Sequence, residues 1–237
     1  MKLLVVSDIH ANWPALHAIQ EDADAVVCLG DIVTYGPFPR ECLAWVRDRA
    51  THVIRGNHDT ALSHGGDPGA AVHKHALALA TLEDHRRRLS ADEIAWLRDL
   101  PTNIRFRCDD YTLHAFHASP KDHLFSYRIT PDLDDEEMKE EVAEVRSDIV
   151  LLGHTHVPMS RGAWTKVVLN PGSVGQPLDG DPRVSYAVIR NGVAEIRRVE
   201  YDIEQTAAGI REMGLANDAA EALIAILKTG TSLAGPS

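Results

Sequence analysis

Residues 2–10 read KLLVVSDIH, an apolar run that ends abruptly in Asp8 and His10. A run this short that contains β-branched Val is typical of a buried strand. In open α/β sheets, ligands bind just outside the carboxyl ends of the strands. The first expected strand therefore delivers a carboxylate and an imidazole to the place where such a fold holds its site.

The same arrangement recurs along the chain. Short apolar runs end in polar or Gly-rich sequence, and stretches with helical spacing lie between them. Strands that alternate with helices favour a layered α/β architecture. The expected strands span residues 2–7, 25–29, 52–55, 111–117, 148–152 and 166–169, and the expected helices span residues 12–22, 40–50, 70–89, 90–100 and 132–146.

The C-terminal part of the sequence has a different pattern. Residues 184–201 predict a hairpin, because the Asn-Gly dipeptide at 191–192 suits a type I′ turn. Residues 203–228 carry two short amphipathic helical patterns, and the small, polar residues 229–237 predict a disordered tail. We therefore expect one domain over residues 1–228, with the hairpin and the last two helices as a C-terminal elaboration.

Composition limits the classes of function. The 237 residues include 24 Lys and Arg against 35 Asp and Glu, which gives a formal net charge of −11. This balance argues against binding to a nucleic-acid duplex, which requires a basic face. The three cysteines form no CxxC pair, and no apolar stretch reaches the length of a membrane span. The sequence therefore predicts a cytoplasmic protein with no membrane partner.

Polar blocks follow five of the expected strands. A single DxH or HxH pair is a weak signal, because such pairs occur by chance. Five blocks in order, each at a strand end, are hard to explain as coincidence, and they would meet in one crevice. The blocks are Asp8-Ile9-His10, Gly30-Asp31, Gly56-Asn57-His58-Asp59, His117 and Gly153-His154-Thr155-His156.

These blocks resemble the ordered signature of the calcineurin-like metallophosphoesterases, which reads D-x-H, G-D, G-N-H-D/E, H and G-H-x-H. The stretches SDIHANWPAL, GDIVTYGP, RGNHD, FHASP and LNPGSVGQP look like the small single-domain bacterial and archaeal branch. The likeness covers residues 3 to about 190. It implies an α/β fold, a four-layer αββα sandwich of two mixed sheets with a dimetal site at the carboxyl-terminal ends of the strands.

The resemblance also implies a role for each block. His58 would lie near the substrate and protonate the leaving oxygen, and Asp59 would orient His58 through its other ring nitrogen. The implied metal ligands are Asp8, His10 and His156 for one ion, Asn57, His117 and His154 for the other, and Asp31 as the bridge between both.

These residue types suit the hydrolysis of a phosphate ester. Two cations about 3.5–4 Å apart stabilise the attacking and leaving oxygens of an in-line displacement. Two divalent ions outweigh the two negative charges of Asp8 and Asp31, since Asn and His ligands are neutral, so the site would attract a phosphate anion. Nitrogen and oxygen ligands without thiolate favour two divalent transition-metal ions over Ca²⁺, with Mn as the first expectation and Fe, Zn, Co or Ni as alternatives.

Three further residues are candidate substrate contacts. Asn12 and Arg55 flank ligand blocks, although Arg55 could equally pair with a local carboxylate. Ser173 ends a segment, residues 170–173, that resembles the N-P-G-S turn of the family. Leu178 stands where relatives often carry Arg, so this phosphate contact of the family is not carried over.

The resemblance implies a dimetal-dependent phosphoesterase that hydrolyses phosphodiester or phosphomonoester bonds of small, nucleotide-like substrates by in-line attack of a metal-bound hydroxide. The same fold and site leave open a serine/threonine protein phosphatase and a dinucleoside polyphosphate hydrolase. A non-catalytic scaffold of the same fold is a further alternative, and the complete set of ligand positions argues against it. The expected partner is a small phosphate-ester substrate, and association into a homo-oligomer stays open.

Overall fold

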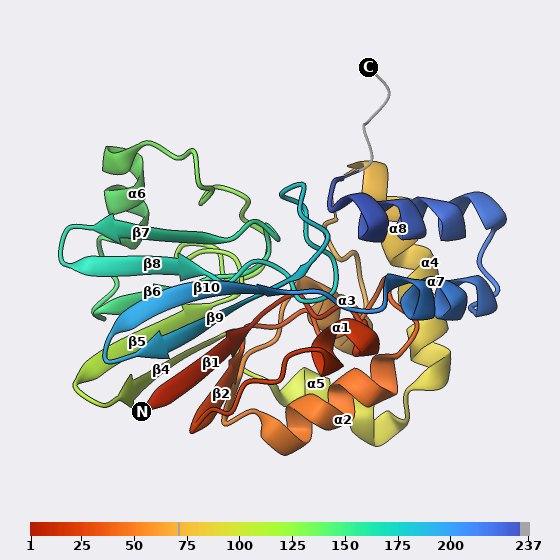
Figure 1. Ribbon diagram of the computed structural model, residues 1–237, viewed down its shortest axis with the longest axis horizontal. Coiled ribbons are helices and arrows are strands. Elements are labelled where there is room, and N and C mark those ends of the chain that lie inside the picture. The colour runs from red at the N-terminus through yellow and green to blue at the C-terminus, as the bar shows by residue number, and fades with distance from the viewer. Residues whose placement is uncertain (71, 233–237) are drawn as a thin grey trace.

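Two five-stranded sheets pack against each other in the computed structural model, which describes residues 1–70 and 72–232 (Figure 1). The first sheet contains β1 (Lys2–Val6), β2 (Ala25–Cys28), β3 (His52–Val53), β9 (Val184–Arg190) and β10 (Val193–Val199). The second contains β4 (Asn103–Cys108), β5 (Tyr111–Phe116), β6 (Ile149–Leu151), β7 (Met159–Ala163) and β8 (Lys166–Asn170). Their strand orders are β10-β9-β1-β2-β3 and β4-β5-β6-β8-β7, and each mixes parallel and antiparallel pairs.

Both faces of β1 are buried. Leu3 and Val5 lie in the apolar core between the two sheets, together with Leu113 of β5. Leu4 and Val6 belong to the apolar core on the outer side of the first sheet. Because successive side chains of a strand point to opposite faces, burial on both sides explains why the run is continuously apolar rather than alternating.

Helices cover the outer faces of the sheets (Figure 1). α1 (Trp13–His17), α2 (Pro39–Arg49) and α5 (Ala91–Asp99) contribute to the core on the first sheet, and α6 (Asp135–Val142) contributes to the core on the second. The predicted sandwich of two mixed sheets flanked by helices is confirmed. None of the described helices is both long and apolar enough to cross a membrane. The remaining helices are α3 (Asn57–His64), α4 (Val72–Arg88), α7 (Ile203–Glu212) and α8 (Asn217–Thr229).

Parallel pairing brings the polar blocks to one edge of each sheet. β1, β2 and β3 run parallel, and so do β5, β6 and β8. The loops that follow β1, β2, β5 and β6 carry Asp8, Asp31, His117 and His154, and Asn57 begins α3 soon after β3. The fold therefore positions these side chains through strand direction alone.

Two strands and one helix were not expected from the sequence. β4 and β7 lie at the two edges of the second sheet, where most of their residues are half-buried or exposed, so neither contains an apolar run. α3 begins at Asn57, inside a block that reads as a turn. α6 begins at Asp135, later than expected from residue 132, because the Asp134 side chain accepts the Glu136 N–H and caps the helix there.

The C-terminal elements are built into the body of the fold. The expected hairpin forms β9 and β10, and β9 pairs with β1, so the hairpin is part of the first sheet rather than an addition to it. Thr229 is the last residue of α8, and the Gly230 carbonyl accepts the Gly180 N–H at 2.8 Å. The expected tail thus begins later than residue 229, and its residues 233–237 lie outside the described residues.

Candidate metal centre

Two groups of buried ligand-type side chains lie at the carboxyl-terminal ends of the strands. The first group contains Asp8 and His10, which follow β1, and His156, which follows β6. Each group draws on both sheets, and within each the candidate ligand atoms lie within 4.8 Å of one another. The second group contains Asp31, His117 and His154, which follow β2, β5 and β6.

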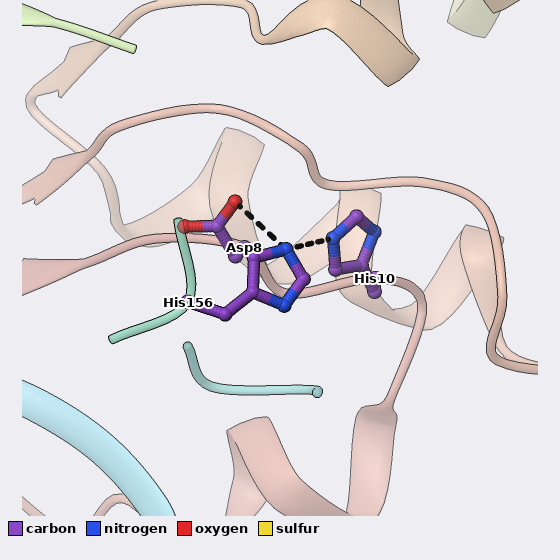
Figure 2. A group of neighbouring side chains, drawn as sticks. All are labelled: Asp8, His10 and His156. Atoms are coloured by element: carbon purple, nitrogen blue, oxygen red, sulfur yellow. Dashed lines mark hydrogen bonds and ion pairs between the residues drawn. The ribbon is translucent and has the colours of Figure 1, made fainter. Parts of the chain in front are cut away.

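The three side chains of the first group point toward one another (Figure 2). The Nε2 atoms of His10 and His156 are 3.1 Å apart, and His156 Nε2 lies 3.5 Å from Asp8 Oδ1. His10 Nδ1 donates to the Val33 carbonyl at 3.1 Å, and His156 Nδ1 donates to the Gln176 carbonyl at 2.6 Å. In a neutral imidazole the other nitrogen then carries a lone pair. Two facing lone pairs cannot hydrogen-bond to each other, so this arrangement suits a cation.

The second group gathers oxygen and nitrogen atoms around His117. His117 donates through Nδ1 to the Leu29 carbonyl at 2.8 Å. Although burial opposes it, Asp31 raises the pKa of His117 to about 9, so its Nε2 holds a proton between Asn57 Oδ1 at 2.9 Å and Asp31 Oδ2 at 3.3 Å, the place that a cation would take. Asn57 donates through Nδ2 to the Pro68 carbonyl at 2.5 Å, which turns its Oδ1 toward the group.

Two buried atoms of the second group, Asp31 Oδ2 and His154 Nε2, have no hydrogen-bond partner among residues 1–70 and 72–232. Such atoms are rare in native proteins and call for a water or an ion. Asp31 Oδ2 lies 3.9 Å from His10 Nε2 of the first group and 3.3 Å from His117 Nε2 of the second. One carboxylate oxygen thus faces both groups. The donor set fits two divalent cations, and together with the fold it supports a dimetal site.

Burial sets the charges of these ligands. It raises the pKa of Asp8 to about 7, and it lowers the pKa of His10 to about 4 and that of His154 to about 3. Burial also opposes ionisation of Asp31, but His117, His58 and His10 together outweigh it and hold the pKa of this carboxyl well below its usual range. His10 and His154 are therefore neutral at pH 7, the form in which an imidazole binds a metal.

Five of the residues that supply these ligands hold an unusual backbone conformation. Asp8, His10, Asp31, His154 and His156 have φ values between 45° and 67°. For residues other than Gly this left-handed region costs about 1–3 kcal/mol each and persists only where the surroundings fix it. The strain is therefore concentrated at the strand ends that form the candidate centre.

The start of α3 holds Asp31 in place. The backbone N–H of His58 donates to Asp31 Oδ1 at 2.9 Å, a favourable position for a carboxylate at a helix N-terminus. Gly56 approaches so closely that a Cβ at this position would overlap the Asp31 carboxylate. The glycine of the GNHD block is therefore required by this close approach.

His58 lies beside the first group. It is 4% exposed, and its ring centroid is 5.1 Å from that of His10. Its Nδ1 lies 2.9 Å from Thr34 Oγ1, which itself donates to the Val33 carbonyl at 2.6 Å, so His58 Nδ1 is the donor. Burial lowers the pKa of His58 to about 3, and the resting form is a neutral ring with its lone pair on Nε2.

The side chain of Asp59 accepts hydrogen bonds from three backbone N–H groups. Its Oδ1 accepts the backbone N–H groups of Ile32 at 2.9 Å and Val33 at 3.3 Å, and its Oδ2 accepts that of Gly56 at 3.1 Å. The described residues include no hydrogen bond between Asp59 and His58. Because its lone pairs are directed at backbone donors, Asp59 ties the start of α3 to the loop after β2.

Two of the three expected substrate contacts are fully engaged within the protein. Asn12 is 1% exposed; it caps α1 by accepting the Ala15 N–H at 3.3 Å and donates to the Gly175 carbonyl at 2.9 Å. Ser173 is fully buried, and its hydroxyl donates to the Asp8 carbonyl at 2.7 Å. Both side chains therefore shape the loops of the centre rather than face a substrate.

Arg55, the third expected contact, points toward α5. Its Nη1 donates to the carbonyls of Arg98 and Leu100, at 2.6 Å in both cases. The last carbonyls of a helix have no partner within the helix, and a guanidinium satisfies them well. Arg55 thus stabilises the end of α5, and neither the expected phosphate contact nor the alternative carboxylate pair describes it.

A lysine beside the centre was not predicted from the sequence. Lys74 on α4 is 7% exposed; its Nζ donates to Gln176 Oε1 at 3.4 Å and lies 5.6 Å from the ring centroid of Tyr35. Burial lowers the pKa of Lys74 to about 8, although Asp8 and Asp31 oppose this shift. Helical spacing places this lysine on a helix but does not show which neighbours will cover it.

Two tyrosines border the ligand groups. The Tyr35 ring lies 4.8 Å from the His10 ring and is buried, and the Tyr127 ring lies 4.0 Å from the His154 ring. Tyr127 is 47% exposed. The centre therefore has an aromatic border that reaches solvent on the side of the second group.

The fold and the two ligand groups define a metal-binding α/β sandwich with its centre at the strand ends. The model of the calcineurin-like phosphoesterase superfamily domain matches residues 1–191, and the chain belongs to this superfamily. Membership supports a hydrolase that acts on phosphoric esters.

Three relatives illustrate the likeness. A metallophosphoesterase from Sphaerobacter thermophilus, known from a crystal structure, is 31% identical with a TM-score of 0.78, and the match covers 98% of this chain and 99% of that chain. The protein MJ0912 of Methanocaldococcus jannaschii is 31% identical over 225 residues, which are 86% of this chain and 89% of that protein. The phosphodiesterase YfcE of Escherichia coli K12 is 26% identical over 204 residues, which are 83% of this chain and 91% of that protein.

Proposed function

We propose that the chain is a dimetal-dependent phosphoesterase that hydrolyses phosphodiester or phosphomonoester bonds of small, nucleotide-like substrates. The observation that carries the proposal is the convergence of buried lone pairs in two groups that share Asp31. The superfamily supports phosphoric esters as the substrate class, and the phosphodiesterase YfcE is a relative with a named activity of this kind.

The proposed ions would be held by nitrogen and oxygen atoms only. When bound, they would supply Lewis acidity that lowers the pKa of water and stabilises negative charge on the phosphoryl oxygens. A donor set without thiolate fits Mn, Fe, Zn, Co or Ni and does not single out one of them. Mn²⁺ is the ion that we propose first. The proposed ligands are Asp8, His10 and His156 for one ion, Asn57, His117 and His154 for the other, and Asp31 for both.

His58 is the proposed proton donor to the leaving oxygen. Its Nδ1 is engaged by Thr34, which leaves Nε2 for the substrate. Burial favours the neutral ring, and an anionic substrate in contact with it would raise its pKa. Thr34 then acts as the positioning residue that the sequence assigned to Asp59.

The burial of the centre favours a small substrate. His10, His58 and His154 are 1%, 4% and 3% exposed. A serine/threonine protein phosphatase must admit a segment of a folded protein, so this alternative is less favoured. A dinucleoside polyphosphate hydrolase fits better, because only one phosphoryl group has to reach the centre.

We also propose that residues 1–228 form a single domain and that the protein is cytoplasmic. Pairing of β9 with β1 supports the first proposal. The second is supported by three free, buried cysteines, which suit a reducing compartment.

The test is a screen of protein stripped of metal and reloaded with Mn²⁺, Fe²⁺, Zn²⁺, Co²⁺ or Ni²⁺. The substrates are bis-p-nitrophenyl phosphate, p-nitrophenyl phosphate, cyclic nucleotides, dinucleoside polyphosphates and phosphopeptides. We expect two ions per chain, turnover of small esters by the reloaded protein and none by the stripped protein. Asp109→Asn, at an exposed carboxylate that pairs with the N-terminus, is the control that keeps activity. Two bound ions without turnover of any substrate would contradict the proposal and favour a scaffold.

A further inference from the structure

Lys74 is a buried cation that has no carboxylate partner in the part of the chain that the structure describes. It is 7% exposed, and no carboxylate among residues 1–70 and 72–232 lies within the 4.0 Å of an ion pair from its Nζ. Lysine is almost never buried unless it is paired. Within these residues its Nζ donates to Gln176 Oε1 at a long 3.4 Å, which engages one of three N–H donors. This lysine therefore lacks the anion that its position requires.

Lys74 is connected to the first ligand group on two sides. Gln176, which accepts from its Nζ, also offers its backbone carbonyl to His156 Nδ1 at 2.6 Å. Tyr35, whose ring lies 5.6 Å from the ammonium nitrogen, has its ring centroid 4.8 Å from that of His10. One residue thus separates Lys74 from each of two proposed ligands.

Tyr35 adds a second unused donor. Its residue is 3% exposed, and within the described part of the chain its hydroxyl has no hydrogen-bond partner. Its ring centroid lies 5.0 Å from that of His58, the proposed proton donor. The ligand groups hold a surplus of lone pairs, whereas Lys74 and Tyr35 hold a surplus of N–H and O–H donors. Cations would accept the lone pairs of the ligand groups, and the oxygens of an anion would accept hydrogen bonds from Lys74 and Tyr35.

Metal binding increases the need for an anion beside Lys74. Two divalent cations would neutralise Asp8 and Asp31, the carboxylates whose charges act on Lys74, and an anion in contact with the ammonium group offsets the added positive charge. The charge of the anion also matters. Coulomb attraction to Lys74 is twice as large for a doubly charged phosphate monoester as for a singly charged diester at the same distance.

We propose that Lys74 and Tyr35 donate hydrogen bonds to the phosphoryl oxygens of the substrate, and that Lys74 makes the site favour doubly charged phosphate monoesters over singly charged diesters. This inference rests on the proposed phosphoesterase function. The two residues take the place that the sequence assigned to Asn12, Arg55 and Ser173.

The experiment compares metal-loaded wild type with Lys74→Met, which removes the charge, Lys74→Arg, which keeps it, and Tyr35→Phe, which removes only the hydroxyl. Arg87→Met is the matched control, because Arg87 is an exposed cation on the same helix. Titration calorimetry gives the affinity for inorganic phosphate. Kinetics give kcat/KM for p-nitrophenyl phosphate and for bis-p-nitrophenyl phosphate, and metal content and Tm are measured for every variant.

We expect Lys74→Met to weaken phosphate binding by about 10- to 100-fold, as for the loss of a charge-assisted hydrogen bond. Its kcat/KM for the monoester should fall by a similar factor and that for the diester by a clearly smaller one. Lys74→Arg should retain most of the affinity, and Tyr35→Phe should lose about 3- to 10-fold. All variants should bind two ions, and Tm should rise in Lys74→Met because an unpaired buried charge is removed.

Unchanged phosphate affinity in Lys74→Met, or equal losses for monoester and diester, would overturn the inference. A lower Tm with unchanged phosphate affinity would assign Lys74 a purely structural role and overturn it as well. If wild type with two bound ions hydrolyses neither these esters nor any other substrate of the screen, the proposed function fails instead. Phosphate affinity alone then decides whether Lys74 and Tyr35 form an anion site.

Discussion

Asp31 and His58 are joined by a hydrogen bond from the His58 backbone N–H to Asp31 Oδ1 at 2.9 Å. The other oxygen, Oδ2, has no hydrogen-bond partner among the described residues and faces both ligand groups. The two oxygens of this carboxylate are therefore used differently, since the protein fixes one and leaves the other for cations. A substitution that removes the negative charge of Asp31 can therefore keep the side chain in the same position.

Asp31→Asn should keep the fold and lose metal. The Asn Oδ1 can still accept the His58 N–H, while the neutral amide no longer supplies a charge shared by two ions. We expect fewer than two ions per chain by elemental analysis. We also expect kcat/KM to be at least about 100-fold lower, in line with several kcal/mol of lost charge stabilisation. A variant that retains two ions and full activity would refute the bridging role.

His58→Asn should keep two ions and lower kcat by about 10²- to 10⁴-fold, the usual contribution of a general acid. The loss should be larger for esters with basic leaving groups, because these depend most on protonation. The measurement compares p-nitrophenyl phosphate with phenyl phosphate. An equal loss for both substrates would mean that His58 is not the acid.

Asp59→Asn should affect stability rather than the protonation step. The Asn side chain places an N–H donor where Asp59 accepts from Ile32 or Gly56, so at least one buried N–H loses its partner. We expect a loss of about 1–3 kcal/mol in the free energy of unfolding, measured by urea denaturation. A lower kcat with unchanged stability would instead support the orienting role expected from the sequence.

His85 should make stability depend on pH in the acidic range. It is fully buried, accepts the Thr34 N–H through Nδ1 at 3.0 Å and donates to the Gly36 carbonyl through Nε2 at 2.9 Å. Burial lowers its pKa from 6.5 to about 4. Below pH 6.5 the unfolded chain therefore binds a proton that the folded chain does not, so stability is present above this pH and is lost as the pH falls toward 4.

The matched variant is His85→Gln, because Gln can accept and donate the same two hydrogen bonds without titrating. Between pH 6.5 and 4, wild type should lose about 3 kcal/mol more stability than His85→Gln. Urea denaturation across this range measures the difference. Parallel pH profiles of the two proteins would show that His85 does not contribute.

The strand ends could be predicted because strand direction alone determines where they meet. Asp8, Asp31 and His117 each end an apolar run, and parallel pairing then places them at one edge. β4 and β7 were not predicted, because an edge strand that is half exposed contains no apolar run. Pairing, not composition, makes these two segments strands.

The partners of individual side chains could not be read from the sequence. Asn12 and Arg55 lie next to ligand blocks in the chain, yet their hydrogen bonds go to groups brought close by the tertiary fold. Lys74 lies outside every ligand block in the sequence and reaches the centre only because α4 packs beside it. Proximity to a ligand block in the sequence therefore did not show which side chains face the centre.

Each ligand group contains residues that follow strands of both sheets. Ions bound there would join the two sheets at the edge where the apolar core between them ends. Metal occupancy of the centre would then determine how firmly the two sheets are held together, as well as turnover. In protein stripped of metal, the two sheets would separate first at this edge. Bound ions would no longer offset the repulsion between the facing lone pairs there or the strain in the backbone.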